Sequence, residues 1–133
     1  MATTICLDFL MFPDNTPMPT PFTLASFNFS KVGAGMDCFV NVSGGDKGLQ
    51  FPDQGIKIKL PAPSTKISLK IGQFSQPIKI SLVSAAGVLV GSAVINAPNK
   101  YTTKNFLLRG KADSVVLTGG NNEGILAKIC ATI

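Results

Sequence analysis

The side chains of this chain that could do chemistry are few, and their types exclude several kinds of active site. In 133 residues there is no His, and there are three Cys and seven Asp or Glu. Without His, Ser-His-Asp and Cys-His nucleophiles and His-based metal sites are excluded. Two carboxylates suffice for glycoside hydrolysis, but Asp14, Asp46 and Asp53 stand beside Pro or Gly in turn sequences, where Asp commonly bonds to nearby backbone. The sequence favours a protein that is not an enzyme.

The candidates for binding a ligand lie mostly in predicted loops. Ligand pockets combine apolar or aromatic surface with a few well-placed polar groups, and this chain has no Trp and one Tyr. The residues that we predict to face a ligand are Tyr101, Asn121, Asn122, Glu123, Asn99 and Asp46. If the loops at one end of the domain converge, these residues form a shallow polar site.

Two further carboxylates, Asp8 and Glu123, lie near the first and the last predicted strand. If those strands pair, both carboxylates could meet at one edge and bind Ca²⁺ together with backbone carbonyl oxygens. The alternative is that each is solvated on the outer face of its own strand.

The three cysteines, Cys6, Cys38 and Cys130, lack the C-x-x-C spacing of zinc sites. Cys6 lies in the first predicted strand and Cys130 in the last, so the two can form a disulfide if the ends of the chain pair in an oxidising compartment. The alternative is that all three are small buried hydrophobic residues, as free Cys usually is.

A two-residue period places these side chains on strands. In the stretch 66–95, Ile67, Leu69 and Ile71 alternate with Lys and Ser, which is typical of a strand with one buried and one wet face. About ten short strands are predicted, at 5–9, 22–29, 36–42, 49–51, 56–60, 66–71, 78–82, 88–95, 104–108, 114–117 and 124–129. Short strands joined by turns at regular spacing predict one all-β domain over 1–133, an antiparallel β-sandwich or jelly roll.

The charge balance is basic but sparse. The formal net charge is +5, while charged residues make up 14% of the chain, against about 25% in typical soluble domains. Five lysines occupy polar positions of successive predicted strands, namely Lys57, Lys59, Lys66, Lys70 and Lys79. They form either a basic stripe for an acidic glycan or polyanion, or a solvated face that discourages edge-to-edge aggregation. With one Arg and no basic run, a nucleic-acid partner is not expected.

The cellular location is inferred from targeting segments and from surface charge. The N-terminal residues lack the basic and apolar regions of a signal peptide, and no segment approaches the roughly 20 apolar residues of a membrane span. A surface so poor in charge is typical of secreted, surface-exposed or self-assembling β proteins, so an extracellular or surface-exposed location is favoured.

Several stretches of the sequence together suggest a relationship to a known fold. They are CLDF at 6–9, FTLASFNF at 22–29, LPAPS at 60–64, ISLKIG at 67–72, PIKI at 77–80 and GGNNEGILAKIC at 119–130. These stretches resemble bacterial β-sandwich domains of the galactose-binding-like type. The resemblance implies a jelly-roll topology and raises the possibility of a calcium site. Members often carry an acidic pair where this chain has Ala127 and Lys128, a departure that counts against such a site.

These observations lead to two hypotheses about function. The first is a non-catalytic binding module that recognises a carbohydrate or cell-surface glycan through the end loops of the sandwich. The alternative is a structural subunit that self-associates into a capsid, fibre or appendage, suggested by the low charge density and by the Pro-rich loop at 13–21.

Overall fold

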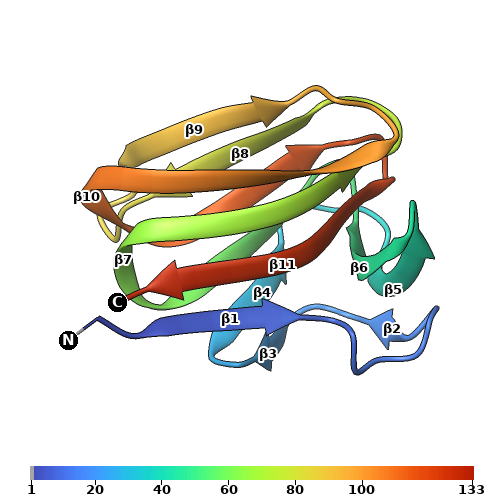
Figure 1. The fold of residues 1–133 in the computed structure, drawn as a ribbon, viewed down its shortest axis with the longest axis horizontal. Coiled ribbons are helices and arrows are strands. Elements are labelled where there is room, and N and C mark those ends of the chain that lie inside the picture. The colour runs from blue at the N-terminus through green and yellow to red at the C-terminus, as the bar shows by residue number, and fades with distance from the viewer. Residues whose placement is uncertain (1) are drawn as a thin grey trace.

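The computed structural model describes residues 2–133, and within this range the chain forms eleven strands and no helix (Figure 1). The strands are β1 (Thr4–Asp8), β2 (Pro17–Met18), β3 (Phe22–Leu24), β4 (Phe27–Lys31), β5 (Cys38–Ser43), β6 (Asp46–Phe51), β7 (Ile56–Gln73), β8 (Ile78–Val83), β9 (Leu89–Ile95), β10 (Lys100–Gly119) and β11 (Gly124–Thr132). All of their pairings are antiparallel. The predicted all-β antiparallel sandwich is confirmed. In the described residues there is accordingly no helix that could cross a membrane.

Two long strands, β7 and β10, connect the two layers of the sandwich. The first part of β7 and the last part of β10 pair with each other, and the back layer runs β3-β4-β7-β10-β8-β9. The last part of β7 pairs with the first part of β10 and with β11. The front layer, nearer the viewer in Figure 1, therefore contains β10, β7, β11 and β1, and it continues from β11 through β6 and β5 to β2.

Each of these long strands was predicted as two short ones. In β7 the predicted break falls at Pro61 and Pro63, which lie where the strand passes from one layer to the other. In β10 the register shifts between Leu107 and Ser114. Pro donates no ladder hydrogen bond and is tolerated at such irregular points of a sheet. The strands therefore continue through residues that would end a regular ladder.

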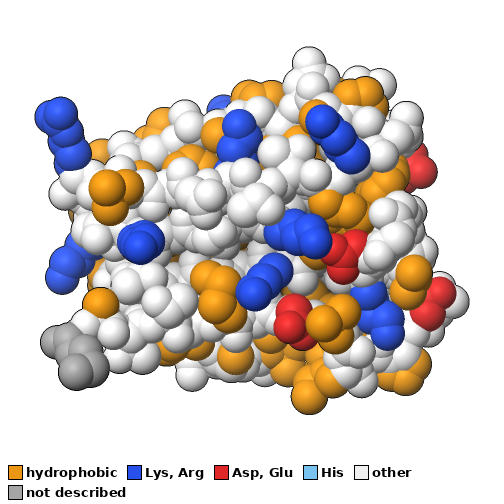
Figure 2. All heavy atoms as spheres, viewed as in Figure 1, with side chains coloured by type: hydrophobic (Ala, Val, Ile, Leu, Met, Phe, Trp, Pro, Cys, Tyr) orange, Lys and Arg blue, Asp and Glu red, His pale blue; other side chains and the backbone are white. Residues whose placement is uncertain are grey.

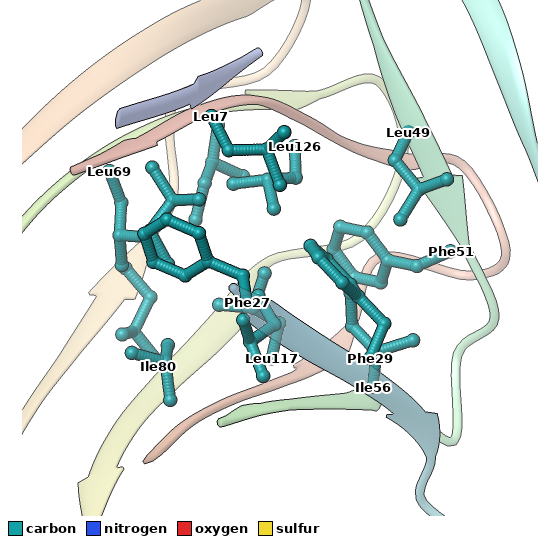
Figure 3. Close-up of a cluster of buried hydrophobic side chains, with 14 of the residues drawn as sticks. Leu7, Phe27, Phe29, Leu49, Phe51, Ile56, Leu69, Ile80, Leu117 and Leu126 are labelled. Carbon is teal, nitrogen blue, oxygen red and sulfur yellow. The ribbon is translucent and has the colours of Figure 1, made fainter. Parts of the chain in front are cut away.

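The core fills the space between the layers. Ile56 and Ile58 of β7 point inward from the back layer, and Ile67, Leu69 and Ile71 point inward from the front. Figure 3 shows phenylalanines of β4 and β6 packed among these aliphatic side chains. Complete burial of each such side chain stabilises the fold by about 1.5–3 kcal/mol.

The change of layer within β7 divides the predicted basic stripe between two faces. Inward positions are even-numbered before the bend and odd-numbered after it. Lys57 and Lys59, with Lys79 of β8, therefore lie on the outer face of the back layer. Lys66 and Lys70 lie on the outer face of the front layer.

The two ends of the chain are joined covalently. β1 pairs with β11 so that Cys6 lies directly opposite Cys130, and the two form a disulfide with an S–S distance of 2.12 Å. Cys38 is a free thiol and is buried in the core. Burial is the main reason why the pKa of the Cys38 thiol is raised to about 11.

Candidate binding face

The outer surface of β1, β11, β7 and β10, here called the front face, presents three rows of neighbouring side chains. Strand register aligns the rows across the four strands. The first row is Asp8, Lys128, Lys70 and Thr103; the second is Cys6, Cys130, Ser68 and Asn105; the third is Thr4, Thr132, Lys66 and Leu107. Every one of these side chains is exposed or partly exposed. The face is therefore mostly polar, and it is built from strands rather than loops.

Two hollows lie in this face. The larger, about 420 Å³, is lined by Thr4, Lys66, Ile67, Ser68, Asn105, Phe106, Leu107, Cys130 and Thr132. The smaller, about 230 Å³, is lined by Ser68, Lys70, Thr103, Lys128 and Cys130. Both linings include Ser68 and Cys130, so the hollows adjoin along β7 between Lys66 and Lys70, and together they are called the trough. Four residues of strand give this trough a length of roughly 13 Å.

One wall of the trough depends on β1. The disulfide fixes the middle of β1 against β11, and the hydroxyls of Thr4 and Thr132 share a hydrogen bond of 2.9 Å nearer the chain ends. The inward side chain of Leu7 is buried in the core. The opposite wall is on β10, where Leu107 is 84% exposed. A large aliphatic side chain held in water beside a hollow offers apolar contact to whatever occupies it.

An ion pair lies at the β6 end of the trough. Lys70 Nζ is 2.5 Å from a carboxylate oxygen of Asp46. The hydrogen bond from Lys70 is the main reason why the pKa of Asp46 is lowered. Partial burial raises this pKa, and a backbone hydrogen bond from Lys47 lowers it further. Asp46, predicted to face a ligand, is thus the partner of a lysine that lines the trough.

Tyr101 lies beyond Lys70 on the front face, in β10 rather than in the predicted loop. Its hydroxyl donates to the backbone oxygen of Ser43 at 2.8 Å, and its ring packs edge-on against Phe74 at 5.5 Å. Lys70 Nζ lies 5.7 Å from the ring centroid. Burial, followed by the nearby carboxylate of Asp46, raises the pKa of Tyr101 to about 12. The half-buried ring lies beside the Lys70 end of the trough.

The polar groups of the loop at 119–123 form hydrogen bonds with neighbouring segments. Asn121 and Asn122 both have positive φ, 53° and 64°. The backbone N–H of Asn121 donates to the Asp53 carboxylate at 2.9 Å, and the backbone N–H of Asp53 donates to Asn122 Oδ1 at 2.8 Å. The Asn121 side-chain amide donates to Ser75 Oγ at 3.2 Å. The two asparagines therefore fasten this loop to its neighbours.

The predicted loop residues do gather at one end of the sandwich, but largely through internal contacts. The backbone N–H of Asn99 donates to the backbone oxygen of Gln73 at 2.7 Å. The side-chain amide of Gln73 donates to the backbone oxygen of Ser75, whose hydroxyl Asn121 contacts. Tyr101 reaches the turn that precedes Asp46. The side chains of Asn99 and Glu123 are exposed.

The two carboxylates predicted to bind Ca²⁺ are not brought together. Asp8 lies opposite Lys128, whereas Glu123 precedes Gly124, which is four residues of extended strand, or roughly 13 Å, from Lys128. Among residues 2–133 no group of three or more Cys, Asp or Glu side chains is placed to hold a metal ion. Calcium takes about six to eight oxygen ligands, and the Asp8–Glu123 pair does not fit this requirement.

The trough residues Ser68, Thr103, Asn105 and Lys128 were not singled out from the sequence. Alternation predicts that Ser68 lies on the wet face of its strand, whereas Thr103 falls outside the predicted strand at 104–108. The sequence did not show which strands are neighbours, and that pairing gathers them into one surface.

The fold resembles that of carbohydrate-binding modules. A family 29 module from Piromyces equi is 14% identical, with a TM-score of 0.55 over 98% of this chain and 90% of its own. A second family 29 module is 14% identical, with a TM-score of 0.56 over 99% of this chain and 89% of its own. The chain has the fold of these modules. No protein-family model matches the sequence, and no curated protein matches it significantly.

Proposed function

We propose that the protein is a non-catalytic carbohydrate-binding module that holds a glycan in the trough of the front face. The observation that carries the proposal is the pair of adjoining hollows across β11, β7 and β10. The shared fold with solved carbohydrate-binding modules supports it, because a fold limits the surfaces available while the site itself supplies the chemistry.

The lining of the trough suits a sugar. Ser68 and Thr132 offer hydroxyls that donate and accept hydrogen bonds, and Asn105 offers an amide that does both. Leu107 adds apolar surface at the rim. A sugar presents hydroxyl groups around its edge and C–H groups on its faces, so it needs both kinds of partner. A few polar groups in a concave and partly apolar surface are typical of small-ligand sites.

The positions of the carboxylates near the trough favour a binding role without catalysis. Neither hollow has a carboxylate in its lining. Asp46 is engaged by Lys70, and hydrolysis of a glycoside needs two carboxyl groups on either side of the scissile bond. The lining of the trough therefore offers a ligand hydroxyl, amide and ammonium groups and no carboxylate.

The end loops are a second possible location for the same function. Tyr101 and Asp46 adjoin the Lys70 end of the trough, so they can border a ligand bound there. The exposed loops contain Asn99, Asn121, Asn122 and Glu123. These are the residues to substitute if variants of the trough leave glycan binding unchanged.

Affinity measurements across a panel of oligosaccharides test the proposal. Asn105→Ala should weaken binding about tenfold, as expected for the loss of one or two hydrogen bonds. Asn28→Ala is the matched control, since Asn28 is an exposed strand residue that pairs with Lys59 on the back layer. A loss on Glu123→Gln but not on Asn105→Ala would move the site to the end loops. No binding to any member of the panel would contradict the function.

A further inference from the structure

We propose that the smaller hollow, between Lys70 and Lys128, is an anion subsite that takes the carboxylate or sulfate group of an acidic glycan. The saccharide part of this inference rests on the proposed function. The anion subsite itself rests on the charges and contacts of the front face.

The two lysines lie on neighbouring strands and line a hollow that has no carboxylate in its lining. Lys70 and Lys128 are directly opposite each other on β7 and β11, and both line the hollow together with Ser68, Thr103 and Cys130. Like charges directly opposite on neighbouring strands destabilise a sheet. An anion in the hollow would offset that repulsion and would accept hydrogen bonds from the Lys128 ammonium group and from the hydroxyls of Ser68 and Thr103.

The carboxylates near the hollow leave one of these lysines available. Asp46 binds Lys70 but does not line the hollow. Lys128 takes part in neither of the two ion pairs formed within the described part of the chain, Lys31–Asp37 and Lys70–Asp46. Its neighbour in register is Asp8, yet no ion pair joins them. Lys128 is therefore the main positive group offered to a ligand.

The rest of the face extends the basic character along the trough. Lys66 lines the opposite end, roughly 13 Å from Lys70, with the neutral Ser68 and Asn105 between them. Figure 2 shows basic side chains spread across this face, while the acidic ones lie in the half nearer β5 and β6. A chain of sugars that carries acidic groups along its length would meet a lysine at each end.

A saccharide fits this surface better than a nucleic acid does. Proteins that bind single strands stack bases on exposed aromatic rings and favour Arg for the phosphates. The single Arg of the chain, Arg109, is not in the lining of either hollow. The ring of Tyr101 is packed against Phe74 and approached by Lys70, so it is not a free platform.

Inorganic sulfate tests the anion subsite without any assumption about the sugar. It is titrated against chloride at matched ionic strength, and backbone amide chemical shifts are followed. The proposal expects saturable sulfate-specific shifts at Ser68, Thr103 and Lys128 that are lost in Lys128→Gln and kept in Lys79→Gln, an exposed lysine of the back layer. Shifts spread evenly over all lysines, or unchanged in Lys128→Gln, would overturn it.

A pair of matched glycans tests the acidic ligand class. Oligogalacturonate and its methyl ester differ at the carboxyl groups alone. The wild-type protein should bind the acid about tenfold tighter at low salt, as expected for a charge-assisted contact, and the preference should fall as salt rises. Lys128→Gln should remove the preference, and Asp46→Asn, which frees Lys70, should increase it.

The two experiments distinguish failure of the anion subsite from failure of the carbohydrate function. Equal binding of acid and ester, with no sulfate site, overturns the subsite and leaves the carbohydrate function standing. Sulfate binding at Lys128 without affinity for any glycan keeps the subsite and removes the carbohydrate. A single-stranded oligonucleotide that binds as tightly as the acid, and is also lost in Lys128→Gln, overturns the saccharide assignment.

Discussion

The hydroxyl of Tyr101 donates a hydrogen bond to the backbone oxygen of Ser43, 2.8 Å away. This contact joins β10 to the turn between β5 and β6, which are far from it in sequence. With Phe74 against one edge of the ring and the Asp46–Lys70 ion pair beside it, Tyr101 forms a partly buried cluster at the end of the trough. The stability of this cluster can be measured separately from ligand binding.

Tyr101 should titrate at unusually high pH. Burial and Asp46 raise its pKa to about 12 in the folded protein, while an unfolded chain would show the ordinary value near 10. The resulting stability is fully present below about pH 10 and is lost as the pH rises through about 12. Because this is the sole tyrosine, phenolate absorbance reports it directly. A midpoint near 10 would contradict the burial, and Tyr101→Phe should remove this part of the alkaline destabilisation.

Asp46→Asn should destabilise the protein in a pH-dependent way. The pKa of Asp46 is lowered in the folded state, chiefly by Lys70, so its contribution is present above the ordinary Asp pKa and is lost as the pH falls through the lowered value. The difference from wild type should be about 0.5–1 kcal/mol at neutral pH and should vanish in acid. Denaturant unfolding at several pH values measures it. A difference that stays constant with pH would show that the ion pair is not its origin.

Removal of the disulfide should weaken both the fold and the wall of the trough. Cys6 and Cys130 are 124 residues apart, and cross-links that close long loops restrict the unfolded chain most. Cys6→Ser with Cys130→Ser should cost about 2–5 kcal/mol of unfolding free energy.

Thiol labelling gives the control for that experiment. In the native protein the one free thiol, Cys38, is buried and has a raised pKa, so a thiol reagent should label nothing until the protein unfolds and one site afterwards. Labelling of three thiols in the unfolded, unreduced protein would contradict the disulfide.

Asn122 should matter for stability through its side-chain oxygen and its backbone. Asn122→Ala removes the acceptor for the Asp53 N–H. It also puts Ala, which adopts positive φ less readily than Asn, at a φ of 64°. A loss of about 1–3 kcal/mol is expected in thermal or denaturant unfolding. Asn122→Asp keeps the acceptor and should lose much less. Equal losses in the two variants would show that the hydrogen bond is not responsible.

The local features of the fold could be read from the sequence. The alternation at Ile67, Leu69 and Ile71 correctly gave a strand with one buried face, and it showed that Ser68 and Lys70 face water. This succeeds because successive side chains leave a strand on opposite sides whatever the strand pairs with.

The candidate site could not be read in the same way. A two-residue period says which side a residue is on but not which strand lies beside it. Thr103 and Lys128 flank Lys70 only because β10 and β11 pair with β7. Tyr101 was predicted in a ligand-binding loop because the Asn and Pro residues before it suggest a turn, whereas the partner of its hydroxyl lies 58 residues earlier in the chain. Contacts at such separations leave no local pattern.

The most direct test of the account is to map a bound oligosaccharide by backbone amide chemical shifts on the intact protein. Binding in the trough predicts that the largest changes fall on Ser68, Asn105 and Lys128, with little change on the back layer. Changes confined to the loop at 121–123 or to the outer face of β8 and β9 would contradict the trough as the binding surface.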